Sequence, residues 1–263
     1  MMNLPLGLML LDLFASCLVV AVLLRLSNRG GLARGPMLLG SIVFLLGMLP
    51  WGDQLARFSI WLHSLQSVAI HHLAPMLWML ALAGTERSEG ERRSTRNRIP
   101  ASAIVMLLVF ALLSWVWMLP SLHTSLMHDA GLYMLMRWAM ALSGLAMLTV
   151  FRKPKAVWQG ENPAGYRFGR WINLSMSGPM LAWGVVMLAA PGLYSEAHMS
   201  TDHAMMMAAL PEFLSLPIAL DQRLGGVIFL LFGLGCLAMA YLPLLARVAE
   251  GVSPKRRRYS WPK

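Results

Sequence analysis

Residues 59–84 read SIWLHSLQSVAIHHLAPMLWMLALAG, and residues 85–98, TERSEGERRSTRNR, follow directly. The first stretch contains no Asp, Glu, Lys or Arg, and it is long enough for an α-helix to cross the hydrocarbon core, which takes about 20 residues. The second stretch carries five arginines. An apolar run followed by a basic connection predicts a membrane helix whose C-terminal end faces the cytoplasm.

The composition of the whole chain agrees with this prediction. Hydrophobic residues make up 57% of the sequence and charged residues only 13%, which is typical of a membrane protein. The net charge of +10 does not indicate nucleic-acid binding, because the basic residues lie in short segments between apolar runs. Cys17 and Cys236 each lie inside an apolar run without a CxxC spacing, so no disulfide framework or zinc ribbon is expected.

Seven apolar runs predict an all-α integral membrane protein, a bundle of about seven transmembrane helices. The runs cover, approximately, residues 4–26, 37–51, 59–84, 100–120, 131–151, 171–191 and 224–246. We expect one transmembrane domain over residues 1–250 and a basic cytoplasmic tail over residues 251–263. The first run is too long for a signal peptide and lacks a preceding basic segment, so it is interpreted as a retained helix. Pro50 is expected to end the second run.

The basic residues determine the predicted orientation. The connections after the first, third, fifth and seventh runs hold 19 of the 22 Lys and Arg residues, and only Arg57, Arg137 and Arg223 lie elsewhere. Positive charge favours the cytoplasmic side, so the N-terminus is predicted outside the cytoplasm and the C-terminus inside. The expected location is the bacterial inner membrane.

None of the seven histidines lies in a predicted cytoplasmic connection. His63, His71 and His72 lie in the third run. At 100° per residue His63 and His71 share a helix face with Ser67 between them, whereas His72 is expected to point to nearly the opposite side. An ionisable side chain within a span indicates function by default, although a hydrogen bond to another helix is the structural alternative. Pro75 is expected to distort this helix and free a carbonyl.

A second group of candidate ligands lies in the outer connection before the last run, where residues 196–207 read EAHMSTDHAMMM. Imidazole and thioether donors suit Cu(I), so copper is the metal hypothesis. An amphipathic interfacial segment is the alternative interpretation. The candidate metal ligands of the whole chain are His63, His71, His128, His198, His203, Met205, Met206 and Met207.

Charged residues within the spans need partners in the bundle. Arg137 is expected to pair with Asp12, Asp129 or Asp221. Asp221 begins the last span, where it suits the helix dipole, and it is also a candidate partner for a metal-binding histidine. Gly225 and Gly226 next to it permit close helix approach.

Three groups of residues resemble the CtaG-like family of bacterial cytochrome c oxidase assembly factors over about residues 55–240. They are the histidine-bearing span ending at Ala74-Pro75, the segment from Met127-His128-Asp129 to residues 135–140 (LMRWAM), and residues 221–226 (DQRLGG). The resemblance implies a seven-helix inner-membrane protein that helps to load copper into the oxidase. This chain departs from the family pattern at Ser67, where a second histidine is expected, and at Met118, a soft ligand that can replace an imidazole.

The sequence therefore predicts a protein that assists assembly of a haem-copper oxidase by binding or delivering copper at the extracytoplasmic face. Oxidase subunits within the membrane and periplasmic copper chaperones are the expected partners. No motif for hydrolysis, nucleotide use or covalent haem attachment occurs, so an enzyme is not expected. A copper permease and a carrier of b-type haem or quinone are the alternatives. The lack of histidine on the cytoplasmic side disfavours the first, and the restriction of intramembrane histidines to one span disfavours the second.

Overall fold

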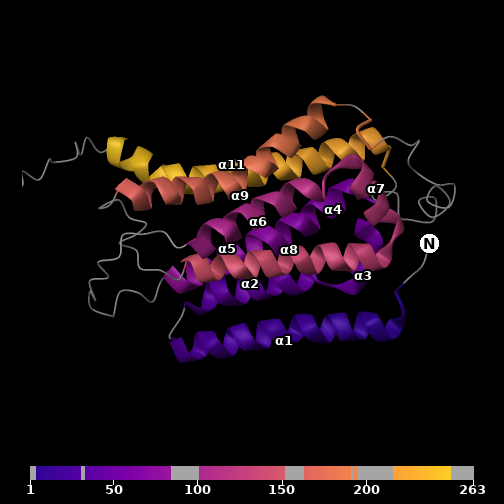
Figure 1. The fold of residues 1–263 in the computed structure, drawn as a ribbon, viewed down its shortest axis with the longest axis horizontal. Coiled ribbons are helices and arrows are strands. Elements are labelled where there is room, and N and C mark those ends of the chain that lie inside the picture. The colour runs from indigo at the N-terminus through magenta and orange to yellow at the C-terminus, as the bar shows by residue number, and fades with distance from the viewer. Residues whose placement is uncertain are drawn as a thin grey trace, which may run out of the picture.

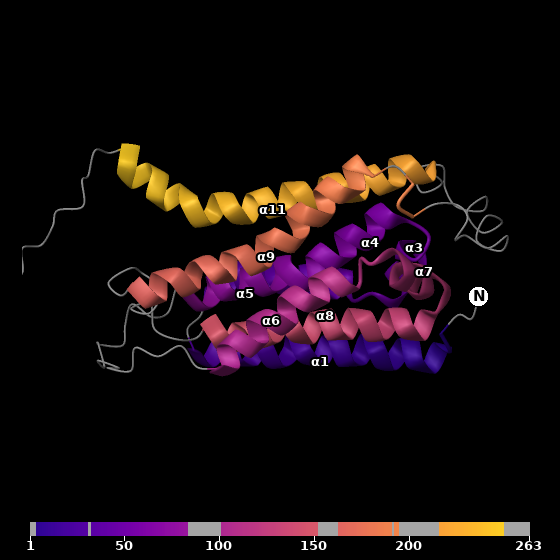
Figure 2. The same cartoon turned by 45° about the horizontal axis from the view of Figure 1, so that its top comes forward.

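The computed structural model describes residues 4–30, 33–83, 101–151, 163–190, 192–194 and 216–249, and its regular elements there are helices. This confirms the predicted all-α class for the described residues. The helices pack side by side as one bundle, with α1 and α11 at opposite edges (Figures 1 and 2). Their bounds are α1 Leu6–Gly30, α2 Arg34–Gly47, α3 Pro50–Ala56, α4 Ile60–Ser67, η1 Val68–Leu73, α5 Ala74–Ala83, α6 Ala101–Val116, α7 Pro120–His128, α8 Ala130–Phe151, α9 Pro163–Ala189 and α11 Ile218–Ala249.

Four described helices, α1, α8, α9 and α11, are long and apolar enough to span a membrane. Two further pairs pass the same test but are bent, α2 with α3 by 61° and α6 with α7 by 77°, which gives up to six spans when each pair counts as one. The helical chain also runs without a gap from Ile60 to Ala83 through α4, η1 and α5. The chain is thus a membrane protein with several spans. Residues 251–263, the predicted tail, lie outside the described residues, and the predicted division into domains remains untested.

Prolines account for both bends. Pro50 and Pro120 occupy the first turns of α3 and α7, and the residues before them, Leu49 and Leu119, are extended. A residue before proline avoids the helical region, and proline itself is well placed at a helix start. The second run therefore ends before Pro50 as predicted. The residues after Pro120 lie between two predicted spans, but they form a further helix, α7, and this helix brings His123 into the bundle.

Residues Val68–Leu73 form a π-helical segment, η1, which ends two residues before Pro75. Pro75, the second residue of α5, has no N–H to donate to a carbonyl of the preceding turn, so the regular α-helical hydrogen bonding is interrupted there, which is the distortion expected. A π-helical turn holds more residues than an α-helical turn, so successive side chains are separated by a smaller angle around the helix axis. His71 and His72, which are adjacent in η1, are both buried and line the same cavity. The prediction that His72 points away from the face of His71 is wrong, because it assumed an undistorted α-helix.

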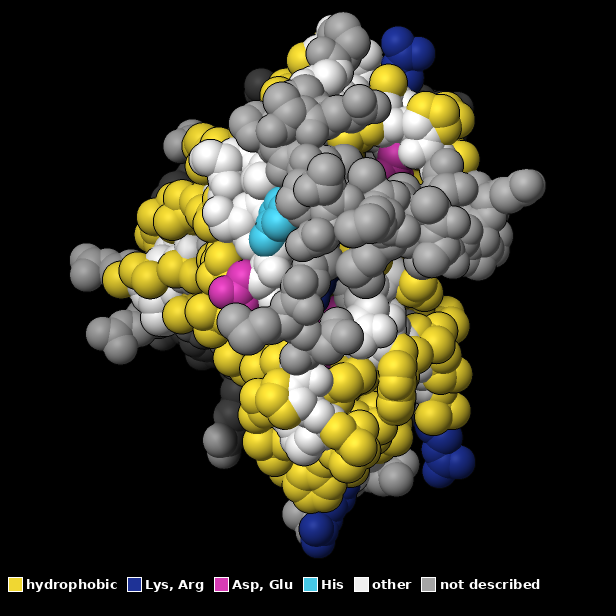
Figure 3. Space-filling model, turned by 90° about the vertical axis from the view of Figure 1, so that its right-hand side faces the viewer, with side chains coloured by type: hydrophobic (Ala, Val, Ile, Leu, Met, Phe, Trp, Pro, Cys, Tyr) yellow, Lys and Arg dark blue, Asp and Glu magenta, His cyan; other side chains and the backbone are white. Residues whose placement is uncertain are grey.

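Glycines bring α9 and α11 into close contact. A Cβ atom built on Gly184 would lie 2.9 Å from the carbonyl oxygen of Gly226, and one built on Gly226 would lie 3.0 Å from that of Gly184. Only glycine permits two backbones to approach this closely. At the surface, exposed hydrophobic side chains surround the end of the bundle where α1 begins (Figure 3), which suits contact with lipid.

Candidate functional site

A buried ion cluster joins α1, α3 and α8. The Arg137 guanidinium is fully buried, forms an ion pair with Asp12, and has its Nη1 atom 3.0 Å from Asp53 Oδ1. Trp138 Nε1 also donates to Asp12 Oδ1 at 2.6 Å. Of the three acidic partners considered from the sequence, the structure pairs Arg137 with Asp12. Asp53 was not predicted as a partner of Arg137, because it becomes buried only through the 61° bend between α2 and α3.

A chain of hydrogen bonds leads from this cluster to His63. Gln66 Nε2 donates to Asp53 Oδ1 and to the Gly47 carbonyl oxygen, both at 2.8 Å. The Tyr133 hydroxyl donates to Gln66 Oε1 at 2.6 Å, and His63 Nδ1 lies 3.0 Å from the same hydroxyl. Within the described part of the chain, His63 Nε2 is buried and has no hydrogen-bond partner. The hydrogen bond at Nδ1 therefore fixes the orientation of the His63 ring, while Nε2 has no partner among the described residues.

His71 lies between two serines from other helices. Its Nδ1 atom is 3.3 Å from Ser114 Oγ of α6, and its Nε2 atom is 2.9 Å from Ser143 Oγ of α8. The ring also packs on Phe110 at a centroid distance of 3.9 Å. Both ring nitrogens are therefore engaged, which is the structural alternative that the sequence left open for an intramembrane histidine.

His72 differs from its neighbour. Its ring contacts His71, Phe110 and Phe232, and neither ring nitrogen has a hydrogen-bond partner among the described residues. A buried, unpaired polar group costs about 1–3 kcal/mol. Buried polar groups in native structures almost always have a hydrogen-bond partner, and a bound ligand would supply one for His72.

His123 was not among the predicted ligands. The α7 helix places its ring 4.8 Å from that of His63 and 4.5 Å from that of Tyr194, measured between centroids. The Tyr194 hydroxyl in turn donates to the Met118 carbonyl oxygen at 2.7 Å. Burial raises the pKa of Tyr194, so this hydroxyl keeps its proton. The sequence offered one signal, since Pro120 followed by helix-forming residues is a helix start.

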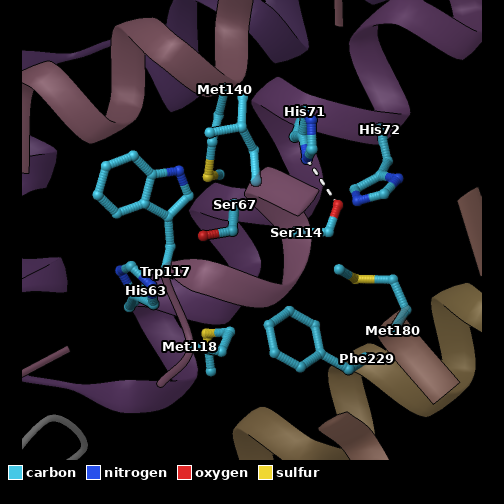
Figure 4. Close-up of a pocket in the computed structure, with 11 residues that line it drawn as sticks. His63, Ser67, His71, His72, Ser114, Trp117, Met118, Met140, Met180 and Phe229 are labelled. Atoms are coloured by element: carbon cyan, nitrogen blue, oxygen red, sulfur yellow. Dashed lines mark hydrogen bonds between the residues drawn. The ribbon is translucent and has the colours of Figure 1, made fainter. Parts of the chain in front are cut away.

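The three histidines of the third run line one small cavity, whose volume of about 10 Å³ is about enough for a single water molecule. Figure 4 shows imidazoles from α4 and η1 and the thioethers of Met118, Met140 and Met180 around it, while α6 contributes Ser114 and α11 contributes Phe229. Among the described residues, no three His, Cys, Asp or Glu side chains form a metal cluster. The cavity is lined by His63, Ser67, His71, His72, Leu113, Ser114, Trp117, Met118, Met140, Met180 and Phe229.

The remaining predicted ligands are not part of this cavity. His128 lies half-buried at the end of α7, where its Nδ1 atom donates to the Thr124 carbonyl oxygen at 2.7 Å. His198, His203, Met205, Met206 and Met207 lie outside the described residues, so their role remains a prediction. His63 and His71 line the same cavity, together with His72 and Met118, and their role as metal ligands remains a prediction.

Asp221 stabilises a different helix from its own. Its carboxylate accepts hydrogen bonds from the Ser59 hydroxyl at 2.9 Å and from the backbone N–H groups of Ile60 at 2.7 Å and Trp61 at 3.0 Å. These groups form the first turn of α4, whose N–H groups need an acceptor. Asp221 of α11 therefore caps α4, the helix that carries His63.

A family model described as Cytochrome c oxidase caa3 assembly factor (Caa3_CtaG) matches residues 17–250, which include every described helix except the start of α1. The chain belongs to this assembly-factor family. No curated protein and no solved structure matches the chain. Membership of the caa3 assembly-factor family supports the predicted resemblance and favours a non-catalytic role.

Proposed function

We propose that this protein assists the assembly of a haem-copper oxidase in the bacterial inner membrane by binding or delivering copper at the extracytoplasmic face. The family match supports the oxidase assembly role. The observation that supports copper is the cavity, which combines imidazole and thioether side chains inside the bundle. These two donor types suit Cu(I) better than the hard cations, which prefer oxygen.

The proposal includes seven spans with the N-terminus outside. The helical stretch Ile60–Ala83 supplies a seventh span beside the four long helices and the two bent pairs, since it is about 36 Å long at 1.5 Å per residue. An odd number of spans agrees with Figure 1, where α1 begins at one end of the bundle and α11 ends at the other. The elements α3, α4 and α7 lie at the end where α1 begins, so His63 and His123 belong to the outer half.

Copper delivery requires a site that also releases its ion. A site of two or three neutral donors binds less firmly than a closed thiolate cage, which suits transfer to a client protein. The expected partners are oxidase subunits that dock within the bilayer and periplasmic copper chaperones. His128 and the predicted outer ligands His198, His203 and Met205–Met207 would receive or pass the ion at the surface.

The test is deletion of the gene in a strain that depends on a haem-copper oxidase. We expect oxidase activity and the copper content of the purified oxidase to fall, and a plasmid copy of the wild-type gene to restore both. Normal oxidase activity and normal copper content in the deletion strain would contradict the assembly role. A fully active oxidase with reduced copper import would instead indicate the copper permease, for which vesicle uptake of copper is the direct assay.

A further inference from the structure

The four buried histidines that the structure describes form two separate pairs. The rings of His71 and His72 lie 4.6 Å apart, measured between centroids, and those of His63 and His123 lie 4.8 Å apart. In Figure 4 His63 lies across the cavity from His71 and His72. Both nitrogens of His71 are hydrogen-bonded to serines, whereas His63 and His123 each have a buried nitrogen without a partner among the described residues. In the second pair, therefore, both rings can offer a nitrogen to one ligand.

The hydrogen bonds around Gln66 determine which nitrogen of His63 carries a proton. The Gly47 carbonyl oxygen only accepts, so the Gln66 atom 2.8 Å from it must be the amide nitrogen, and Oε1 must face Tyr133. The Tyr133 hydroxyl donates its single proton to Gln66 Oε1 at 2.6 Å, so its oxygen accepts from His63 Nδ1, 3.0 Å away. A neutral His63 therefore carries its proton on Nδ1 and has a lone pair on Nε2.

His123 supplies the second lone pair, because a neutral imidazole has one donor nitrogen and one acceptor nitrogen. Both of its nitrogens are buried and lack a hydrogen-bond partner in the described part of the chain. Such unpaired groups typically cost about 1–3 kcal/mol each, and an ion held by both rings would satisfy one nitrogen of each. His63 belongs to α4 and His123 to α7, so the two rings meet from separate helices.

The distance between the two rings fits a shared ion. A metal–nitrogen bond to imidazole is about 2.0 Å long, which places the centroids of two imidazoles on one ion about 4–6 Å apart. The separation of 4.8 Å between His63 and His123 lies within this range. Their planes are inclined by 78°, so the rings are not stacked face to face. The pair is therefore close enough for both rings to bind the same ion.

The surroundings of the pair favour a monovalent ion. Neither the described ring contacts of His63 and His123 nor the residues lining the cavity include a carboxylate or a thiolate that would neutralise a divalent ion. Structural Zn²⁺ sites are almost always four-coordinate, whereas Cu(I) and Ag(I) are stable with few ligands. Imidazole is a suitable donor for copper. A site with two imidazoles therefore suits Cu(I) better than Zn²⁺.

Two neighbouring residues of α11 position both rings. Asp221 caps the first turn of α4, the helix that carries His63. Gln222 Oε1 accepts from the backbone N–H of Tyr194 at 3.3 Å, and the Tyr194 ring packs against His123 at a centroid distance of 4.5 Å. Gln222 Nε2 also donates to two carbonyl oxygens at the end of α9, at 2.7 and 2.8 Å. The start of α11 therefore holds the supports of the two histidines in a fixed relation.

We propose that His63 Nε2 and one ring nitrogen of His123 bind a single Cu(I) ion between α4 and α7. Copper as the ion rests on the proposed function, whereas the choice of the two donors rests on the ring contact and the unpaired nitrogens. Asp53, Gln66 and Tyr133 orient His63 in the way that outer carboxylates and amides orient metal-binding histidines in general.

The test measures Cu(I) and Ag(I) binding by the purified full-length protein, in competition with a chromophoric Cu(I) chelator. We expect His63→Leu and His123→Leu each to weaken binding by at least about tenfold, because loss of an outer partner alone costs that much. His123→Met is the matched variant, since Met and Leu have similar volumes and only Met carries a soft donor. It should bind more tightly than His123→Leu. The control Ser125→Ala changes an exposed side chain of α7 and should bind as the wild type does.

One measurement does not depend on the folding of a variant. X-ray absorption of the Cu(I)-loaded wild type should show nitrogen neighbours with the outer scattering of imidazole rings. Absence of imidazole scattering, or wild-type affinity in His123→Leu, would overturn the site and would indicate that His123 instead donates a hydrogen bond to His63 Nε2. Equal affinities of His123→Leu and His123→Met, both below that of the wild type, would overturn the role of His123 as a donor.

Failure of this site and failure of the proposed function give different results. If the wild type bound Cu(I) but the donors were not His63 and His123, only this site would be rejected. If the wild type bound neither Cu(I) nor Ag(I), copper binding would be rejected as a whole. The deletion strain would then still decide the assembly role.

Discussion

The Tyr133 hydroxyl of α8 lies 3.0 Å from His63 Nδ1 of α4 and donates its own proton to Gln66. This pair connects two parts of the bundle that the sequence presents separately, the cavity and the buried ion cluster around Arg137. Gln66 bonds Asp53, and Asp53 lies 3.0 Å from Arg137. The ion cluster around Arg137 therefore orients the side chains of Gln66 and Tyr133, and through them the ring of His63.

Replacement of Tyr133 by Phe should weaken metal binding without removing a donor atom. The His63 Nδ1–H group then lacks its acceptor, and neither tautomer is favoured. We expect the affinity for Ag(I) to fall about tenfold, the lower range for loss of an outer partner. Chelator competition on the purified variant is the measurement.

Ser143→Ala is the matched control for Tyr133→Phe, because it removes a hydroxyl that contacts His71 and leaves His63 unchanged. It should bind Ag(I) as the wild type does. Wild-type affinity in Tyr133→Phe would contradict the positioning role of Tyr133.

Replacement of Arg137 by Leu should destabilise the bundle strongly. The change leaves two carboxylates, Asp12 and Asp53, buried without their partner, which typically costs about 3–5 kcal/mol. The midpoint of heat unfolding in detergent should fall. Arg223→Leu is the control, since Arg223 is exposed on α11 and should leave the midpoint unchanged.

A rescue experiment separates charge from packing in this cluster. Adding Asp12→Asn to Arg137→Leu removes one unpaired charge and should recover part of the lost stability. If the double variant were no more stable than Arg137→Leu alone, lost packing of the arginine side chain would explain the effect instead.

The sequence predicted those features that depend on composition and local spacing. The apolar runs predicted the long helices of the bundle. The charges of Asp12 and Arg137 within these runs predicted a buried ion pair, which the structure contains. The glycines of residues 225–226 predicted a close helix contact, and Gly226 makes one with Gly184.

The details of the site depend on distortions that periodicity does not encode. His72 lines the cavity from the π-helical segment, and the residues after Pro120, outside the predicted spans, form the helix that carries His123. The partners of each imidazole come from other helices, so the sequence could not distinguish the engaged His71 from the free His72. The share of His198, His203 and Met205–Met207 in copper binding stays a prediction.

Asp221→Ala should destabilise α4 from a position on α11. Two backbone N–H groups and the Ser59 hydroxyl lose their acceptor, and loss of a cap typically costs about 0.5–2 kcal/mol. The heat-unfolding midpoint should fall for Asp221→Ala and less for Asp221→Asn, which keeps one acceptor oxygen. Equal midpoints for wild type and Asp221→Ala would show that the cap contributes nothing.

Replacement of Gly226 by Ala should separate α9 from α11. The new Cβ atom would lie 3.0 Å from the Gly184 carbonyl oxygen and 3.1 Å from Met187 Cβ, and neither is the end of a flexible side chain. Forced overpacking of this kind typically costs about 1–3 kcal/mol, so the heat-unfolding midpoint should fall. Since α11 contributes Phe229 to the cavity, Ag(I) binding should weaken as well.

The same helix provides the control for Gly226→Ala. A Cβ atom on Gly235 meets nothing within 4 Å, so Gly235→Ala should gain only the higher helix propensity of alanine, up to about 1 kcal/mol. Its midpoint should equal or exceed that of the wild type. If both alanine variants lowered the midpoint equally, glycine flexibility in α11, rather than the contact with Gly184, would be the property that the bundle requires.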